Sequence, residues 1–166
     1  MSSCCSPSNE SSARRPDRAV RPAGELEVEL VDLPGGEFWM GAPEGDGSAD
    51  DGEGPVHPVQ LDAFSIAPTT VTNADFAAFC EATGYVTLAE AEQWSFVFAG
   101  LLPDDFPPTR GVAAAPWWRQ VEGSDWRHPA GPHTTYLDAL DHPVVHVTWD
   151  DARAYCAWSD TRLPTE

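Results

Sequence analysis

The segment from Val86 to Asp141 constrains the fold most, because it shows little of the period of a helix or the alternation of a strand. It is rich in proline and holds four of the seven tryptophans of the chain. Compact domains rarely contain so long an irregular stretch unless it shapes a binding surface, and tryptophans supply rigid apolar anchors for such a surface. We therefore expect irregular chain with a binding role in this segment.

Two helices are predicted, one on each side of this segment, and both begin with the same capping pattern. Thr72 is followed three residues later by Asp75, and Thr148 by Asp151, which is the hydroxyl and carboxylate spacing of a capping box. Apolar residues then recur at helical spacing, and Gly84 ends the first helix. The two apolar stripes predict that both helices pack on a core.

An early hairpin is predicted near the start of the ordered chain. Residues 26–30 alternate apolar and acidic side chains, as a half-exposed strand does. Pro34–Gly36 then has the composition of a turn and precedes a second apolar pair, Phe38 and Met40. We expect residues 26–30 to pair with the strand that follows this turn.

Two further strands are predicted from apolar runs. Residues 59–66 alternate, which places Val59 and Leu61 on one face. Residues 142–147 form a short apolar run before the second helix and are expected to be a buried strand. His146 within that run is expected to be a hydrogen-bonded core or sheet histidine.

The predicted elements indicate one domain of the α+β class with much irregular chain, over residues 25–166. Residues 1–24 are rich in serine, proline and arginine without period, which predicts a disordered tail. At the other end, Pro164 and Thr165 have the pattern of another helix start. Because no helix follows that cap, we expect the chain to be the front part of a longer protein.

Charge excludes several classes of partner. Twenty-seven acidic residues against nine basic ones give a formal net charge of −18, which repels nucleic acid and anionic membrane surfaces. No apolar run approaches the roughly 20 residues of a membrane span, and the N-terminus lacks the apolar core of a secretory signal. We expect a monomer in the cytoplasm that binds neither nucleic acid nor membrane.

The cysteines, histidines and acidic residues do not form a metal-binding pattern, and no metal site is predicted. Cys80 and Cys156 lie inside the two predicted helices and are expected to be buried structural thiols. The acidic stretch from Glu44 to Glu53 lacks the spacing of a helix-loop-helix calcium motif, so we interpret it as a surface loop.

Ala115–Trp118 is the best candidate for a functional site among the residues of this chain. Two adjacent tryptophans in irregular chain cannot both face one helical core stripe, so one interpretation places a tryptophan in a binding groove. The other interpretation has both rings filling a core that lacks regular elements. The residues alone leave both interpretations open.

These segments resemble the formylglycine-generating enzymes, also called sulfatase-modifying factors, over about residues 26–166. The resemblance is close in His142–Trp158 and Arg162–Glu166, and the segments Ala115–Trp118 and Trp126–Pro129 are specific to the formylglycine-generating branch of the wider superfamily. Other matching segments follow in the order of the family: Leu33–Gly41, Asp62–Phe64, Val71–Phe76, Thr83–Tyr85, Ser95–Phe98, Ala113–Trp118 and Trp126–Pro129. The resemblance implies the formylglycine-generating-enzyme fold, a variant of the C-type lectin fold, in an incomplete copy.

The resemblance also implies an activity for the full-length protein. It would be an oxidoreductase that uses O2 to convert a cysteine, in a Cys-x-Pro-x-Arg segment of an unfolded sulfatase polypeptide, to Cα-formylglycine. Copper(I) is the implied cofactor, held by the two thiolates of a Cys-x4-Cys segment. This chain has no such segment, so we expect residues 1–166 alone to be inactive and to contain no catalytic residue.

The resemblance further implies that an extended substrate peptide lies in a surface groove, held by apolar anchors and main-chain hydrogen bonds. The substrate-binding residues that it suggests in this chain are Trp117, Trp118, Ser95 and Phe96. Trp94 departs from the family pattern, because relatives with a Gly-Asp-Ser segment carry Asp there. Calcium is possible in the full-length protein, but the acidic ligand position expected in this half matches Thr70, a neutral hydroxyl.

Two alternatives share the fold. A non-catalytic paralogue would bind sulfatase-like peptides or another protein without oxidising them. An iron-dependent sulfur oxygenase of the ergothioneine-making type would add a separate histidine-rich metal module, and the Trp117–Trp118 pair argues against it.

Overall fold

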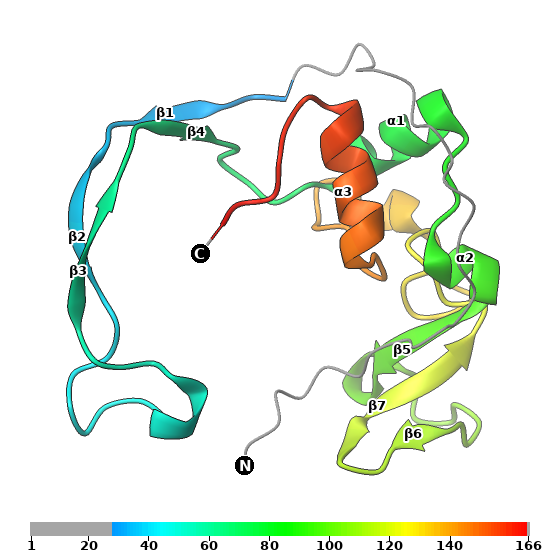
Figure 1. Ribbon diagram of the computed structural model, residues 1–166. Helices are drawn as coiled ribbons and strands as arrows, with labels where there is room; N and C mark the ends of the chain where they lie inside the picture. The colour runs from blue at the N-terminus through cyan, green and yellow to red at the C-terminus, as the bar shows by residue number, and fades with distance from the viewer. Residues whose placement is uncertain (1–27, 166) are drawn as a thin grey trace. The chain divides into compact units, whose positions relative to one another are not determined.

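The computed structural model describes residues 28–165, whose course is shown in Figure 1. These residues divide into two compact units, 28–68 and 69–165. The predicted tail, 1–24, lies outside the described residues, as does the start of the strand predicted over 26–30. The part of that strand that is described, 28–30, is not in strand conformation, and the first strand begins at Val31.

In the first unit, two chain segments run antiparallel as one long two-stranded ribbon (Figure 1). Its strands are β1 (Val31–Leu33), β2 (Gly36–Met40), β3 (His57–Leu61) and β4 (Phe64–Ile66). β1 pairs with β4 and β2 with β3, and the register continues without a shift from one pair to the next. The early hairpin predicted around Pro34–Gly36 is therefore wrong, because the two strands on either side of this turn do not pair with each other.

The ribbon is interrupted at Pro34 and Gly35, which belong to neither strand. Leu33 opposes Phe64 before the interruption, and Phe38 opposes Val59 after it. Gly35 is required at this point, because a Cβ there would lie 2.7 Å from a carbonyl oxygen of the facing segment. No side chain described in this unit is buried.

The predicted strand 59–66 is present but divided, since β3 ends at Leu61 and β4 begins at Phe64. Val59 and Leu61 share a face, as predicted. The loop between β2 and β3 contains the short 3-10 helix η1 (Ala49–Asp51). Glu53 closes this loop with its backbone carbonyl, which accepts from the amide of Ala42 at 2.7 Å.

Both helices predicted in the second unit are confirmed, with their caps. They are α1 (Asn73–Thr83) and α3 (Trp149–Trp158). Capping boxes join Thr72 to Asp75 and Thr148 to Asp151, and Gly84 ends α1 in the left-handed conformation. A third capping box, which the sequence analysis did not predict, starts the short helix α2 (Leu88–Glu92).

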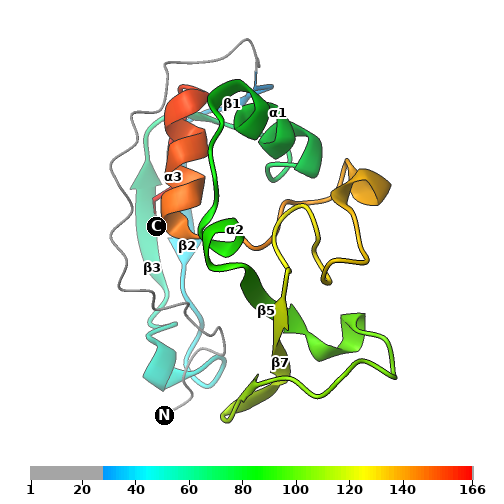
Figure 2. The same ribbon diagram turned by 90° about the vertical axis from the view of Figure 1, so that its right-hand side faces the viewer.

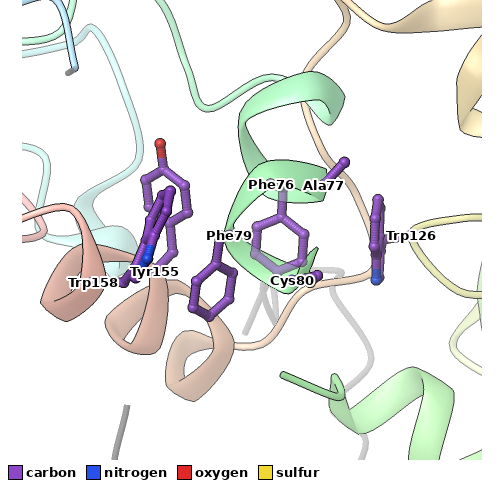
Figure 3. Packing of buried hydrophobic residues seen from close by; sticks show 7 residues of the cluster. All are labelled: Phe76, Ala77, Phe79, Cys80, Trp126, Tyr155 and Trp158. Atoms are coloured by element: carbon purple, nitrogen blue, oxygen red, sulfur yellow. The ribbon is translucent and has the colours of Figure 1, made fainter. Parts of the chain in front are cut away.

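The core of the second unit is a cluster of aromatic side chains from α1, α3 and the turn that holds Trp126 (Figure 3). Phe76 packs edge-on against Trp126, with ring centres 5.3 Å apart, and Phe79 packs edge-on against Tyr155 at 5.7 Å. Each large side chain buried in this way contributes about 1.5–3 kcal/mol through the apolar surface that it removes from water. Cys80 is buried in the cluster, as predicted, whereas Cys156 is only half-buried.

A three-stranded antiparallel sheet occupies part of the segment that was expected to be irregular (Figures 1 and 2). Its strands are β5 (Trp94–Phe98), β6 (Gly111–Val112) and β7 (Ala115–Glu122), in the order β5-β7-β6. The expectation of irregular chain throughout 86–141 is therefore wrong for this part. It holds for most of the rest, where the other described elements are the short helix α2 and the 3-10 turns η2 (Ala99–Leu101) and η3 (Tyr136–Ala139).

The strand predicted over 142–147 is absent, and that prediction is wrong. His146 adopts a φ of 58°, in the left-handed region, and cannot continue an extended strand. The segment instead gives single backbone bonds to the start of α1: the amide of Asn73 donates to the carbonyl of His142 at 2.9 Å, and Pro143 forms an isolated bridge with Thr72.

The described residues confirm the mixed helix and strand content that the sequence predicted. None of the helices in residues 28–165 has the length and apolar character needed to cross a membrane. The helix start predicted at Thr165 involves Glu166, which lies outside the described residues.

Candidate functional site

The sheet of the second unit has one buried face and one face covered with aromatic side chains. Val97 and Val121 lie on the buried face, each 1% exposed. Strand alternation and the β5–β7 register put every second residue on the other side. We call this side the aromatic face; its aromatic residues are Trp94, Phe96, Phe98 and Trp118.

The rings on the aromatic face contact one another in pairs. Trp94 and Phe96 meet edge to face with centroids 5.2 Å apart, and Phe98 meets Trp118 in the same way at 6.3 Å. Phe98 is 46% exposed, and the other three side chains are half-buried. Rigid apolar rings at this degree of exposure form a surface on which another apolar group can pack.

Trp117 and Trp118 belong to a strand, and the expectation that they lie in irregular chain is wrong. They sit where the register of β7 jumps relative to β6, from the pair Val112↔Ala115 to the pair Gly111↔Arg119. Trp117 is 41% exposed and Trp118 half-buried, so the interpretation in which both rings fill the core is also wrong. Trp126 lies in the core instead, with its side chain fully buried.

Ser95 leaves β5 on the opposite side from Phe96 and meets the irregular segment before α3. The Ser95 hydroxyl lies 2.8 Å from Nδ1 of His146, and Nε2 of His146 lies 2.8 Å from the carbonyl oxygen of Pro129. A carbonyl can only accept, so Nε2 carries the ring proton. Burial lowers the pKa of His146 below its usual value and keeps the ring neutral, so Nδ1 accepts the hydroxyl proton of Ser95.

The four predicted substrate-binding residues are thus placed on more than one surface. Phe96 and Trp118 share the aromatic face, whereas Ser95 lies on the other side of β5 and is joined to His146. Trp117 is adjacent to Trp118 in the register jump. The structure brings Phe96 and Trp118 onto one surface and separates Ser95 from them.

Glu90 holds together the region that carries Pro129, and the sequence analysis missed this role. One carboxylate oxygen accepts from the backbone and hydroxyl of Thr87 and from the indole of Trp126, the last at 3.1 Å. The other accepts from the guanidinium of Arg127 at 3.1 Å, and this guanidinium stacks 4.2 Å over the Trp126 ring. The spacing of Thr87 and Glu90 could have predicted the capping box. No sequence pattern indicates the contacts of Glu90 with Trp126 and Arg127, which are distant in the sequence.

An open pocket of about 280 Å³ lies beside this carboxylate, lined by Glu90, Gln93, Gly123, Asp125, His128 and Pro132. Its carboxylates are occupied by groups of the chain itself. Asp125 accepts from the backbone amides of Arg127 and His128, at 2.7 and 2.9 Å, and from the His128 ring at 3.2 Å. We therefore assign the pocket walls to fold stabilisation.

The described residues do not offer a site for a thiophilic metal. No group of three or more His, Cys, Asp or Glu side chains in the part of the chain that the structure describes is arranged to hold a metal ion. Burial raises the pKa of Cys80 to about 12, so its thiol stays protonated at neutral pH and does not supply a thiolate ligand. Cys156 has no cysteine partner among the described residues.

Comparison with known protein families shows which family the chain belongs to. The sequence model of the sulfatase-modifying factor enzyme 1-like domain matches residues 17–166, which is most of the chain. The chain belongs to this family, the formylglycine-generating enzyme and sulfatase-modifying factor family, and has its type of fold.

Individual relatives refine the comparison. The formylglycine-generating enzyme of Thermomonospora curvata is 47% identical over 88% of this chain and 48% of its own length. The bovine protein named inactive C-alpha-formylglycine-generating enzyme 2 is 48% identical over 84% of this chain and 46% of its own length. Hercynine oxygenase of Mycolicibacterium thermoresistibile is 35% identical over 70% of this chain and 23% of its own length.

The chain thus spans less than half the length of each of these relatives. Overall identity to the formylglycine-generating enzyme and to the inactive protein is nearly the same. Identity over this part of the fold therefore does not separate an oxidising member of the family from a non-oxidising one.

Proposed function

We propose that the protein containing this chain is a formylglycine-generating oxidase. It would use O2 to convert the cysteine of a Cys-x-Pro-x-Arg segment, in an unfolded sulfatase polypeptide, to Cα-formylglycine. Membership of the family carries this proposal, together with the similarity to proteins named formylglycine-generating enzyme over most of the chain. Hercynine oxygenase is less similar, at 35% identity, and matches less of the chain, so the alternative of an iron-dependent sulfur oxygenase is favoured less than the formylglycine-generating oxidase.

In this proposal the chain supplies part of the substrate-binding surface. Phe96 and Trp118 give the aromatic face, where apolar side chains of an extended peptide can pack. Trp117, adjacent to Trp118 in β7 and 41% exposed, offers a further apolar side chain outside the aromatic face. Ser95, the fourth predicted contact, lies on the other side of β5, where its hydroxyl bonds to His146, and is not part of this face. The formal charge of −18 favours a peptide that carries an arginine, since opposite charges raise the rate of encounter.

Copper(I), the cofactor implied by the family, would supply the activation of O2 when bound. The described residues of this chain do not fit it, because copper(I) prefers thiolates and the Cys80 thiol is buried and protonated. The sequence contains no Cys-x4-Cys segment either. We therefore propose that the copper ligands belong to other parts of the full-length protein and that residues 1–166 alone do not oxidise the peptide.

A second function is favoured by one observation. The bovine relative named inactive is as similar to this chain as the relatives named enzymes. A non-catalytic member would use the same peptide-binding surface to hold a sulfatase-like segment or another protein. The two proposals predict the same binding surface and differ in whether the bound cysteine changes.

Binding and oxidation are tested separately in the full-length protein. A fluorescent Cys-x-Pro-x-Arg peptide is titrated with the protein, and the same peptide is then incubated with copper and O2 and analysed by mass spectrometry. We expect tight binding and conversion of the cysteine to an aldehyde. Binding without conversion would favour the non-catalytic member, and absence of both would refute the two proposals.

Variants of the aromatic face connect the binding result to this chain. Phe96→Ala and Trp118→Ala should each weaken peptide binding about 5- to 30-fold, in line with the loss of one apolar anchor. Leu101→Ala is the matched control, because Leu101 follows β5 closely and is 68% exposed. Equal affinities for all three variants would exclude the aromatic face as the binding surface.

A further inference from the structure

The aromatic face carries a carboxylate at one end. The β5–β7 register sets Trp94 opposite Glu122 and Phe96 opposite Gln120, so both polar side chains leave β7 on the same side as the four rings. Glu122 is exposed, and it is the charged residue among those that β5 and β7 place on this face. An apolar surface with a negative charge at one end is complementary to a ligand with a positive charge beside its apolar groups.

The Glu122 carboxylate keeps most of its capacity to accept hydrogen bonds. Its contact on the face is with a neutral group, the side-chain amide of Gln120, which donates to Oε1 at 3.2 Å. No arginine or histidine among the described residues, 28–165, forms an ion pair with Glu122. This includes Arg110, whose backbone carbonyl accepts from the amide of Gln120 at 2.8 Å. The second carboxylate oxygen can therefore accept from an external donor.

Trp94 places an indole ring next to this carboxylate. Side chains directly opposite each other on paired strands have Cβ atoms about 4.5–5.5 Å apart. Phe96 packs edge to face against Trp94, with ring centres 5.2 Å apart, which restricts where the indole can turn. A cation that reaches Glu122 thus lies close to a tryptophan ring, the best aromatic partner for a cation. Arginine suits such a pair better than lysine, because its planar guanidinium can bind a carboxylate and stack on a ring.

We propose that Glu122 and Trp94 form the subsite that binds the arginine of the peptide. This inference rests on the proposed peptide-binding function and gives the peptide a direction. Strand residues rise about 3.3 Å each, so Trp94 and Phe98 lie about 13 Å apart along β5, the span of four residues in an extended peptide. With its arginine at Glu122, a Cys-x-Pro-x-Arg segment along the face has its proline near Phe96 and its cysteine near Phe98 and Trp118.

A peptide with an uncharged analogue of arginine isolates this contact. Citrulline has nearly the shape of arginine but no charge, so the ratio of affinities for the arginine and citrulline forms of a fluorescent Cys-x-Pro-x-Arg peptide measures what the charge contributes. We expect the full-length wild-type protein to bind the arginine form about 3- to 10-fold more tightly. In Glu122→Gln the ratio should fall to near 1. Trp94→Leu should lower it in part, because leucine keeps an apolar contact but has no aromatic face for a cation.

Two matched variants show whether the effect is local. Glu81→Gln removes the same charge from an exposed position of α1 and should leave the ratio unchanged, which separates a contact with the peptide from the overall charge of −18. Phe98→Ala, at the other end of the face, should weaken the binding of both peptides by the same factor.

Equal affinity of the wild type for the two peptides, or a ratio in Glu122→Gln equal to the wild-type ratio, would overturn the inference and leave the peptide-binding function in place. A fall of the ratio in Glu81→Gln as large as that in Glu122→Gln would overturn it as well. If the wild type binds neither peptide, the proposed function fails, and the role of Glu122 fails with it.

Discussion

The carboxylate of Glu90 accepts the indole N–H of Trp126 at 3.1 Å, which links the first turn of α2 to the centre of the core. The same carboxylate caps α2 through Thr87 and pairs with Arg127. One side chain therefore orients a helix, a buried tryptophan and the turn that leads to Pro129. Loss of the Glu90 charge should therefore destabilise the helix α2, the packing of Trp126 and the turn that leads to Pro129.

Glu90→Gln should lower the free energy of unfolding by about 1–3 kcal/mol, since one amide oxygen cannot replace two carboxylate oxygens that accept from four donors. Glu81→Gln, at an exposed position of α1, is the matched control and should change it by less than about 0.5 kcal/mol. Urea unfolding followed by tryptophan fluorescence measures both. Similar small effects in the two variants would show that Glu90 does not organise this region.

The two tryptophans at the ends of α3 provide a second comparison. Trp158 is 2% exposed and packs on Phe79 with ring centres 5.6 Å apart, whereas Trp149 is 65% exposed. Trp158→Ala should cost about 3–5 kcal/mol of stability and Trp149→Ala less than about 1 kcal/mol. Thermal and urea unfolding test the difference; a larger loss from the Trp149 variant would contradict the described core.

The stability of the fold should depend on pH through His146. Burial lowers its pKa in the folded protein below the ordinary value of 6.5, against the raising effects of the Pro129 hydrogen bond and the negative charge of Asp125. As pH falls below about 6.5, the unfolded chain therefore binds a proton that the folded chain does not, and the free energy of unfolding decreases. This contribution stops growing once the pH passes below the folded pKa.

His146→Asn is the control for this pH dependence, because asparagine does not titrate and accepts the same backbone conformation. The difference in unfolding free energy between wild type and variant, measured from pH 7.5 to pH 5, should shrink as the pH falls, roughly over the window below 6.5. A difference that stays constant over this range would show that His146 does not have a lowered pKa.

Reactivity should separate the two helical cysteines. Burial raises the pKa of Cys80 to about 12, so almost none of it is thiolate at pH 8, whereas Cys156 is half-buried. Iodoacetamide at pH 8 should modify Cys156 well before Cys80 in the folded protein, and both at similar rates in urea. Peptide mapping by mass spectrometry follows the two sites, and faster labelling of Cys80 in the folded protein would be inconsistent with its buried position.

The helices were predictable from sequence because their signals are local. Thr72 and Thr148 each lie three residues before an aspartate, and the capping boxes form within the first turn. β5 was missed because Ser95 is the single polar residue of Trp94–Phe98, so that the run shows no regular alternation of apolar and polar residues. Residues 142–147 have a strand-like composition, but His146 adopts the left-handed conformation, and its ring bonds to Ser95 and Pro129, which lie far away in the sequence.

In the candidate site, too, the residues could be predicted from the sequence but their arrangement could not. Trp117, Trp118, Ser95 and Phe96 could be proposed from the family resemblance, which depends on the residues themselves. Their distribution over the two sides of the sheet could not, since it follows from the β5–β7 register and that pairing is tertiary. The partners of Glu90 were hidden for the same reason, since Trp126 and Arg127 lie far from it in sequence.

The most direct test of the account is to trap the product. Full-length protein loaded with copper is incubated in air with a Cys-x-Pro-x-Arg peptide, and an aminooxy reagent captures any aldehyde for mass spectrometry; the peptide with Ser in place of Cys is the control. The account predicts an oxime on the cysteine peptide alone, in smaller yield with Phe96→Ala and Trp118→Ala at limiting peptide. A cysteine peptide that binds but keeps its sulfur throughout would contradict the oxidase assignment.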